Sequence, residues 1–414
     1  MRYHHAILGS YIILASSAWV GCSRVRAATH RPTGGNAGSG APAADGDDGS
    51  AAIRDETAGG ASLAANFQKE LERAVAANKG HGGGVFHIAN AAGTIWEGAA
   101  GLSSGTGSEP MHVEDTFEVA SVTKTLTATA IMMLVEDGRL TLDAPLGRLL
   151  QSPILDSLLV VGGHNYGRDI TVRQLLSHTS GLPDYWYDPP FVHDDTNAFL
   201  EAFLADPERL WVPWDMISYI PGLKPIGRPG QTFHYADTNF VLLALIVEGV
   251  EGRPLREVFR ERIFQPLGMN DTYMSYHEAP VATVTESHRY EDDLDLYHRP
   301  QQSADWGGGG LVSSTRDLSR FLFALADGGI LRDPQSLTAM QRWIPAGEDG
   351  VSYGLGLFGI DLDGSKGKLW GHDGHGNSFM YYWPERGIVF TGTLNQTEND
   401  WWPLVAKAIK KLGR

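Results

Sequence analysis

The sequence predicts an α+β fold, in which both ends of the chain build one antiparallel sheet with flanking helices and an inserted, mainly helical lobe. Short apolar runs at residues 85–88 and 94–96 near the start, and at 379–383 and 388–394 near the end, are typical of strands. The long middle, about 121–340, carries helical apolar patterns and loops instead. Because strands at both ends flank this middle, we expect them to share one sheet, with the functional site between sheet and lobe.

Helices are expected to cover the sheet. Leu63, Phe67, Leu71 and Val75 follow one another at intervals of four residues, which predicts an amphipathic helix over 63–78. Other apolar stretches predict helices at residues 240–250, 318–326 and 403–412.

Composition limits the classes of function. The 414-residue chain is 42% hydrophobic, and its formal net charge of −16 argues against nucleic acids and anionic membrane surfaces as main partners. A single cysteine excludes a disulfide within the chain. His372, Asp373 and His375 lie close together, but their spacing is not that of a known metal motif. We therefore expect neither a metal nor a cofactor.

The N-terminal region is typical of an exported and tethered protein. Arg2 precedes an apolar stretch, 6–21, that is too short for a membrane span and typical of a signal peptide. The tripeptide ending at Cys22 resembles a lipobox, which predicts lipidation of Cys22; the alternative is ordinary cleavage after Ala27. We expect a periplasmic or cell-envelope location. The predicted parts are a signal peptide (1–21), a disordered tether rich in Gly, Ala and Ser (22–62) and a catalytic domain (63–414).

Ser121 and Lys124 form an S-x-x-K pair, which is a candidate catalytic pair. The stretch after Ser121 is apolar nearly all round, which predicts a buried helix with Ser121 at its N-terminus, where the helix dipole favours developing negative charge. Lys124 follows at a spacing that places both side chains on one face. Because burial disfavours a charged lysine, Lys124 is a candidate base for the Ser121 hydroxyl. The alternative is a helix-capping serine beside a lysine whose amine reaches solvent.

Two later motifs complete an ordered set of three. Residues 235–237 read Y-A-D just before an apolar helix, and residues 372–374 read H-D-G just before an aromatic strand. In this order the motifs resemble the S-x-x-K, Y-x-N and K/H-x-G signature of class C beta-lactamases, D-alanyl-D-alanine carboxypeptidases and related esterases. The resemblance covers residues 63–412. It implies a beta-lactamase/transpeptidase-like fold and a penicillin-recognising serine hydrolase.

The resemblance also implies a role for each catalytic residue. Ser121 matches the acylated nucleophile, Lys124 its proton partner, and Tyr235 the tyrosine that moves a proton to the leaving group. His372 matches the first residue of the third motif, where carboxypeptidases and several esterases have histidine and class C lactamases have lysine. The backbone N–H groups of Ser121 and His375 would form the oxyanion hole.

Asp237 departs from the family pattern, because it occupies the position of the family asparagine. A carboxylate accepts hydrogen bonds but cannot donate one as an amide can. Asp237 could therefore hold Lys124 charged or repel an anionic substrate. We expect Asp237, Gly374 and His375 to line the substrate site, without assuming the family's substrate specificity.

Together these residues predict a two-step acyl transfer that needs no cofactor. Ser121 would attack an amide or ester carbonyl, and water would release the acyl group. The H-x-G motif is closest to D-alanyl-D-alanine carboxypeptidases, and an esterase or a class C-like beta-lactamase is the alternative. The expected partner is a small peptide, ester or beta-lactam. A non-catalytic penicillin-binding-type protein is a rival that the complete motif set argues against.

A competing serine, Ser103, lies in a G-x-S-x-G sequence over residues 101–105 that matches the nucleophile elbow of alpha/beta-hydrolases. That elbow requires a helix directly after the serine. The residues that follow are rich in Gly, Ser and Pro, so we expect a loop there instead.

Replacing Ser121 with Ala should abolish both turnover and covalent labelling by a fluorophosphonate probe. The protein should still fold, because loss of a helix cap costs only about 1 kcal/mol. Ser103→Ala is the control and should be nearly silent. Hydrolysis that survives in Ser121→Ala, or activity that is lost in Ser103→Ala, would contradict the assignment of the nucleophile.

Overall fold

The computed structural model describes most of the chain from residue 56 onward. The described ranges are 56–77, 82–104, 107, 109–192, 196–281, 283–291, 294–397 and 399–413. The signal peptide, Cys22 and most of the tether lie outside these ranges, so their assignments stay predictions. Within the described ranges, no helix is both long enough and apolar enough to cross a membrane.

Strands from both ends of the chain form one antiparallel sheet, as the sequence predicts. In the described part of the chain this sheet has eight strands, in the order β10-β11-β12-β13-β14-β15-β1-β2. The two chain ends meet where β1 pairs with β15, with Val85 opposite Thr393 and Ile88 opposite Phe390. The strands are β1 (Gly83–Asn90), β2 (Gly93–Gly101), β10 (Ile344–Pro345), β11 (Val351–Tyr353), β12 (Phe358–Asp361), β13 (Lys368–Gly374), β14 (Ser378–Trp383) and β15 (Ile388–Thr393).

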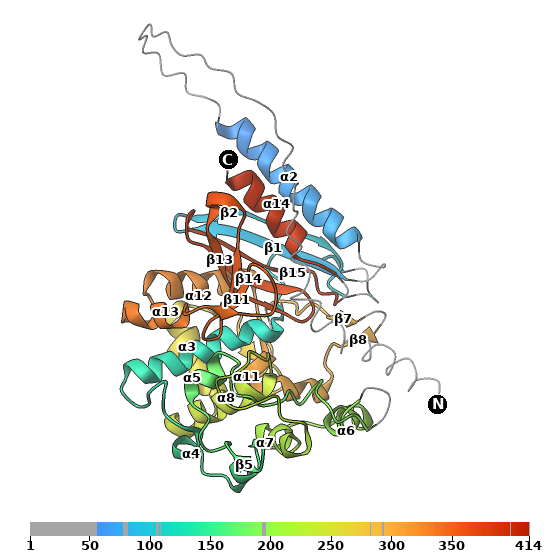
Figure 1. The fold of residues 1–414 in the computed structure, drawn as a ribbon. Coiled ribbons are helices and arrows are strands. Elements are labelled where there is room, and N and C mark those ends of the chain that lie inside the picture. Colours follow the sequence, from blue (N-terminus) through green and yellow to red (C-terminus); the bar gives the residue numbers. More distant parts are fainter. Residues whose placement is uncertain are drawn as a thin grey trace, which may run out of the picture.

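Helices cover both faces of the sheet (Figure 1). α2 (Glu56–Ala76) and α14 (Trp402–Leu412) lie together on one face, and α12 (Thr315–Asp327) packs against β1, β14 and β15 on the other. Leu71 of α2 is fully buried, as the amphipathic pattern predicts. The helix begins ahead of the expected start at Leu63, because residues 56–62 contain no large apolar side chain whose spacing could have revealed a helix.

The second lobe is mainly helical and is centred on α3 (Thr123–Glu136) and α8 (Asp237–Glu251), which pack against each other. α8 buries every residue from Thr238 to Val247, so it behaves as the all-round apolar helix expected from its sequence. The other helices are α4 (Leu146–Leu149), α5 (Val172–Leu176), α6 (Ala198–Ala205), α7 (Pro213–Ile217), α9 (Leu255–Phe259), α10 (Gln265–Leu267), α11 (Trp306–Gly309) and α13 (Pro334–Met340).

Outside the main sheet the described part of the chain has several short strands, and one of them leads into the start of α3. β3, β9 and β6 form a small antiparallel sheet, and β3 leads directly into the turn that contains Ser121. β13 of the main sheet packs against the same turn, so the two lobes meet at Ser121. The short strands are β3 (Phe117–Glu118), β4 (Val160–Val161), β5 (His164–Asn165), β6 (Tyr273–Met274), β7 (Tyr290–Glu291), β8 (Leu294–Asp295) and β9 (Leu311–Ser313).

Candidate active site

Ser121 lies in a tight 3₁₀ turn, Ala120–Val122, that runs directly into α3. Ala120 has a φ of 45°, a left-handed conformation that costs energy for a residue with a Cβ and is found mostly at functional sites. Neither the turn nor α3 has a side-chain cap hydrogen bond. The alternative, in which Ser121 is a helix-capping serine, is therefore wrong, because Val119 and Val122 occupy the cap positions.

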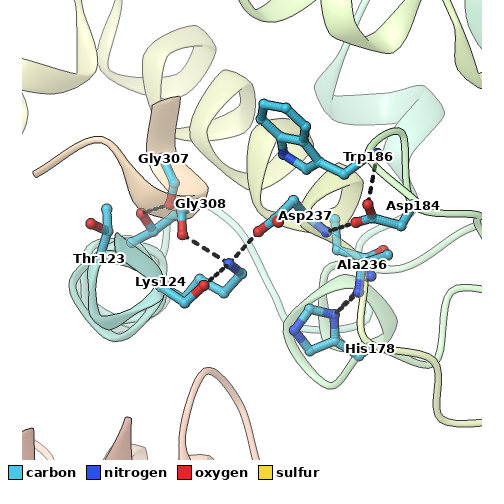
Figure 2. A network of polar contacts seen from close by, with 12 residues as sticks. Thr123, Lys124, His178, Asp184, Trp186, Ala236, Asp237, Gly307 and Gly308 are labelled. Carbon is cyan, nitrogen blue, oxygen red and sulfur yellow. Dashed lines mark hydrogen bonds and ion pairs between the residues drawn. The ribbon is translucent and has the colours of Figure 1, made fainter. Parts of the chain in front are cut away.

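The side chain of Lys124 is completely buried and reaches toward Gly308 and Asp237 (Figure 2). Its Nζ donates to Ser121 Oγ at 2.9 Å and to the carbonyl oxygen of Gly308 at 2.8 Å. It also forms an ion pair with the Asp237 carboxylate. A buried ammonium is costly unless such partners replace water, and here three oxygen atoms do so. This contact places Asp237 where the family asparagine was expected, facing Lys124.

Tyr235 and Asp237 reach Lys124 from the segment that begins α8. Ala236 between them has an extended backbone, so the side chains on either side of it point in the same direction. The centroid of the Tyr235 ring lies 4.9 Å from Lys124 Nζ. The N–H of Asp237 donates to Asp184 Oδ2 at 2.5 Å, which fixes the start of the helix.

His372 on β13 is fully buried, and both of its ring nitrogens have partners. Nδ1 lies 2.6 Å from the carbonyl oxygen of Asp373, and Nε2 lies 3.2 Å from the hydroxyl of Tyr353. Burial, and then the charge of Lys124, lower the pKa of His372 to about 3. His372 is therefore a neutral, fixed side chain at neutral pH, which suits it to shaping the site.

Gly374 is the point where β13 touches the nucleophile turn. A Cβ at Gly374 would lie 2.5 Å from the carbonyl oxygen of Val119 and 3.0 Å from Ala120 Cβ, so only glycine fits. His375 follows directly, and burial, and then the charge of Arg289, lower its pKa to about 3. The third motif and the residue after it therefore present two uncharged imidazoles, those of His372 and His375, to the site.

A cavity of about 220 Å³ opens over Ser121. Its volume suits a small organic substrate. The structure brings together every predicted site residue of the catalytic domain: Ser121, Tyr235, Asp237, His372, Gly374 and His375 line this cavity, and Lys124 contacts Ser121 from behind. Ser103 is buried in the loop after β2, with its hydroxyl directed at the carbonyl oxygen of Glu109 at 3.5 Å, and it does not line the cavity.

Two acidic side chains that no sequence motif predicted, Asp184 and Asp305, also line the cavity. Asp184 accepts hydrogen bonds from the N–H groups of Asp237 and Trp186, and its pKa is raised well above its usual range by burial and by the nearby carboxylates. Asp305 lies directly before α11, and no described residue donates a hydrogen bond to its carboxyl group. Burial raises the pKa of Asp305 to about 7, although Arg289 opposes this. In the sequence, the run of glycines at residues 307–310 is the signal that the backbone after Asp305 approaches the site closely.

In the described part of the chain, no group of three or more His, Cys, Asp or Glu side chains is placed to bind a metal ion. The arrangement instead offers a serine beside a buried ammonium, a tyrosine and a strand edge. Such a set can carry out acyl transfer by nucleophilic and general acid–base catalysis.

Comparison with known protein families and structures supports this chemistry. The family model described as Beta-lactamase matches residues 63–410. A penicillin-binding protein of Bacillus subtilis is 26% identical over 297 residues, which span 68% of this chain and 60% of that protein. The esterase EstB of Burkholderia gladioli is 29% identical over 337 residues, which span 73% of this chain and 81% of the esterase. The chain therefore spans less than two thirds of the Bacillus protein.

Two solved amidase structures share the fold. The D-stereospecific amidohydrolase of a Streptomyces species is 31% identical with a TM-score of 0.69, and the alignment covers 83% of this chain and 98% of that one. The D-amino acid amidase of Ochrobactrum anthropi is 26% identical with a TM-score of 0.69, and the alignment covers 85% of this chain and 100% of the amidase.

Gly374→Ala should impair catalysis more than folding. The new Cβ would push β13 away from Val119 and shift the nucleophile turn, and a displacement of about 1 Å can cost on the order of 10²-fold in rate. Gly222→Ala is the matched control, because a Cβ there meets no atom within 4 Å and Gly222 is not in the left-handed region. The rate of fluorophosphonate labelling and the Tm of both variants test this. Equal labelling rates would show that the close approach is unimportant.

Proposed function

Because the chain belongs to the beta-lactamase family of serine hydrolases, we propose that it hydrolyses amides or esters whose acyl part is neutral or positively charged. The observation that carries this proposal is the excess of carboxyl groups around the nucleophile. Asp184, Asp188, Asp237 and Asp305 line the same cavity as Ser121. Asp237 is ionised in its pair with Lys124, and Asp305 becomes ionised as the pH rises through its pKa of about 7. These negative charges disfavour a substrate with a carboxylate and favour one with an ammonium group.

Lys124 and Arg289, the cationic side chains at the site, already have carboxylate partners. Lys124 is paired with Asp237. Arg289 lines the cavity, but its Nε lies 3.1 Å from Glu118 Oε2. The imidazoles of His372 and His375 are neutral at pH 7 because their pKa values are lowered to about 3. An incoming carboxylate would therefore have to compete for Arg289 with Glu118.

In the proposed reaction the Ser121 oxygen attacks the substrate carbonyl carbon, and a bond to the leaving nitrogen or oxygen then breaks. In its amine form Lys124 takes the Ser121 proton and becomes the ammonium that Asp237 stabilises. Tyr235 gives its phenol proton to the leaving group and recovers a proton from Lys124, so both side chains end the step in the state in which they began. Water then attacks the acyl-enzyme by the reverse route and restores the Ser121 hydroxyl. Backbone N–H groups of Ser121 and His375 are the proposed donors to the oxyanion.

Amino acid amides fit this electrostatic requirement best. Such a compound carries an ammonium next to its carbonyl and has no carboxylate, and two of the similar structures are an amidohydrolase and a D-amino acid amidase. A D-alanyl-D-alanine peptide and a penicillin both carry a carboxylate on the leaving-group side of the scissile bond, close enough for the carboxylates of the cavity to repel it. Carboxypeptidase activity, which the H-x-G motif favours, is therefore our second candidate.

Asp305→Asn should weaken the preference for cationic substrates. The test compares the 4-nitroanilide of trimethylglycine with that of 3,3-dimethylbutyric acid, because the two acyl groups have the same shape and differ by one positive charge. Losing one carboxylate near this charge should lower the cation-to-neutral ratio of kcat/KM roughly tenfold. An unchanged ratio would contradict a role for Asp305 in recognising charge.

The same pair of substrates gives a pH test. A carboxyl group whose pKa is raised to about 7 is mostly neutral at pH 6 and mostly ionised at pH 8. The cation-to-neutral ratio should therefore rise between pH 6 and pH 8 in the parent enzyme, and this rise should disappear in Asp305→Asn.

Asp237→Asn should make the enzyme more tolerant of anionic acyl donors. The variant restores the family amide and removes one negative charge beside Lys124. The ratio of kcat/KM for the monosuccinyl 4-nitroanilide to that for the neutral dimethylbutyryl compound should increase roughly tenfold. If both compounds respond equally, the charge of Asp237 does not select the substrate.

A further inference from the structure

His178 holds the backbone on both sides of Tyr235. It is buried, with 1% of its surface exposed, and lies in the loop that follows α5. Its carbonyl oxygen accepts the N–H of His234 at 2.8 Å, and its Nδ1 accepts the N–H of Ala236 at 3.1 Å (Figure 2). The residues before and after Tyr235 are therefore both fixed by one side chain and its own backbone.

The hydrogen bonds of His178 also define its tautomer. Nδ1 lies 3.0 Å from Asn239 Nδ2, and Asn239 uses its Oδ1 to accept from the Ser180 hydroxyl at 2.6 Å. Because both groups that face Nδ1 are donors, Nδ1 carries no proton and the neutral ring has its proton on Nε2. Burial, and then the charge of Lys124, hold the pKa of His178 well below its usual range. His178 is therefore unsuited to transferring protons itself.

The ring of His178 also packs directly on the catalytic tyrosine. It stacks on Tyr235 with 4.3 Å between centroids and an interplanar angle of 29°. On another side it meets Tyr353 edge to face at 4.8 Å, and the Tyr353 hydroxyl contacts His372 Nε2. His178 thus connects the second motif to the third, although it belongs to neither. Its φ of 54° shows that the fold keeps a strained backbone to place this ring.

We propose that His178 is a positioning residue for Tyr235, which fixes the phenol so that it can deliver a proton to the leaving group. The inference rests on the proposed function of Tyr235. It predicts a specific defect: a displaced tyrosine should slow reactions whose leaving group needs a proton more than reactions whose leaving group departs as an anion.

The experiment measures kcat for a 4-nitroanilide and a 4-nitrophenyl ester of the same acyl group. The departing anilide nitrogen needs a proton, whereas 4-nitrophenolate does not. His178→Phe keeps a stacking ring but leaves the N–H of Ala236 and the amide of Asn239 without their acceptor. It should lower the anilide-to-ester ratio of kcat on the order of 10²-fold, the size of a general-acid contribution, while KM changes little.

His178→Asn tests the same inference with a milder change. Asparagine tolerates a positive φ and places an acceptor oxygen near the position of Nδ1, but it has no ring to stack on Tyr235. The anilide-to-ester ratio of kcat should fall by roughly 3- to 10-fold, so that it lies between the ratio of the parent and that of His178→Phe. This variant also decides the matter if His178→Phe does not fold, and an unchanged ratio would overturn the inference.

His87→Phe is the matched control. His87 is also buried, bonds to Ser319 at 2.8 Å and Thr94 at 2.9 Å, and does not line the cavity. It should lower Tm without changing the anilide-to-ester ratio. If His178→Phe behaves in the same way, or if it lowers both rates equally, His178 is merely structural and the inference fails.

Tyr235→Phe separates this inference from the function on which it rests. If Tyr235→Phe leaves the ratio unchanged, proton delivery by Tyr235 is wrong, and the role of His178 falls with it. If Tyr235→Phe lowers the ratio, adding His178→Phe should lower it little further, because residues that act as one unit are not additive. If the two substitutions instead lower the anilide-to-ester ratio additively, the inference about His178 fails, while the proposed function of Tyr235 stands.

Discussion

The ammonium of Lys124 lies entirely outside solvent, and a charge removed from water costs several kcal/mol unless other groups replace its hydration. Three elements supply these groups: the nucleophile turn brings Ser121 Oγ, α11 brings the carbonyl of Gly308, and α8 brings the Asp237 carboxylate. None of them could move far without leaving the charge uncompensated. The need to solvate one buried cation therefore fixes the relative positions of the parts that carry the proposed chemistry.

The use of a carboxylate in this cluster has consequences beyond Lys124. An amide at position 237 would have left the ammonium's charge unbalanced and able to attract an anion, whereas Asp237 neutralises it locally. Asp305 adds negative charge to the cavity as the pH rises through its pKa of about 7, and the neutral imidazoles of His372 and His375 do not oppose it. The proposed preference for neutral or cationic acyl donors follows from this balance of charge.

The packing of the main sheet against the helical lobe determines how closely the remaining groups approach. β13 can contact the nucleophile turn only because Gly374 has no side chain, and Ala120, the residue of the turn with a positive φ, lies at this contact beside Ser121. The ring of His178 stacks on Tyr235 and supports the second motif. The site is thus held between a strand edge and a buried aromatic layer, and both are far from Ser121 in the sequence.

The sequence by itself determined the features that depend on local spacing. Apolar runs located the strands at both chain ends, and the interval between Ser121 and Lys124 placed both side chains on one face. The ordered motifs identified Tyr235 and His372. Only the tertiary structure decided that Ser121 caps no helix, that Asp305 enters the cavity and that His178 supports Tyr235. The reason is physical: periodicity reports which face of one element is buried, whereas the partners of a charge or a ring come from loops more than fifty residues away, whose paths depend on how the completed lobes pack.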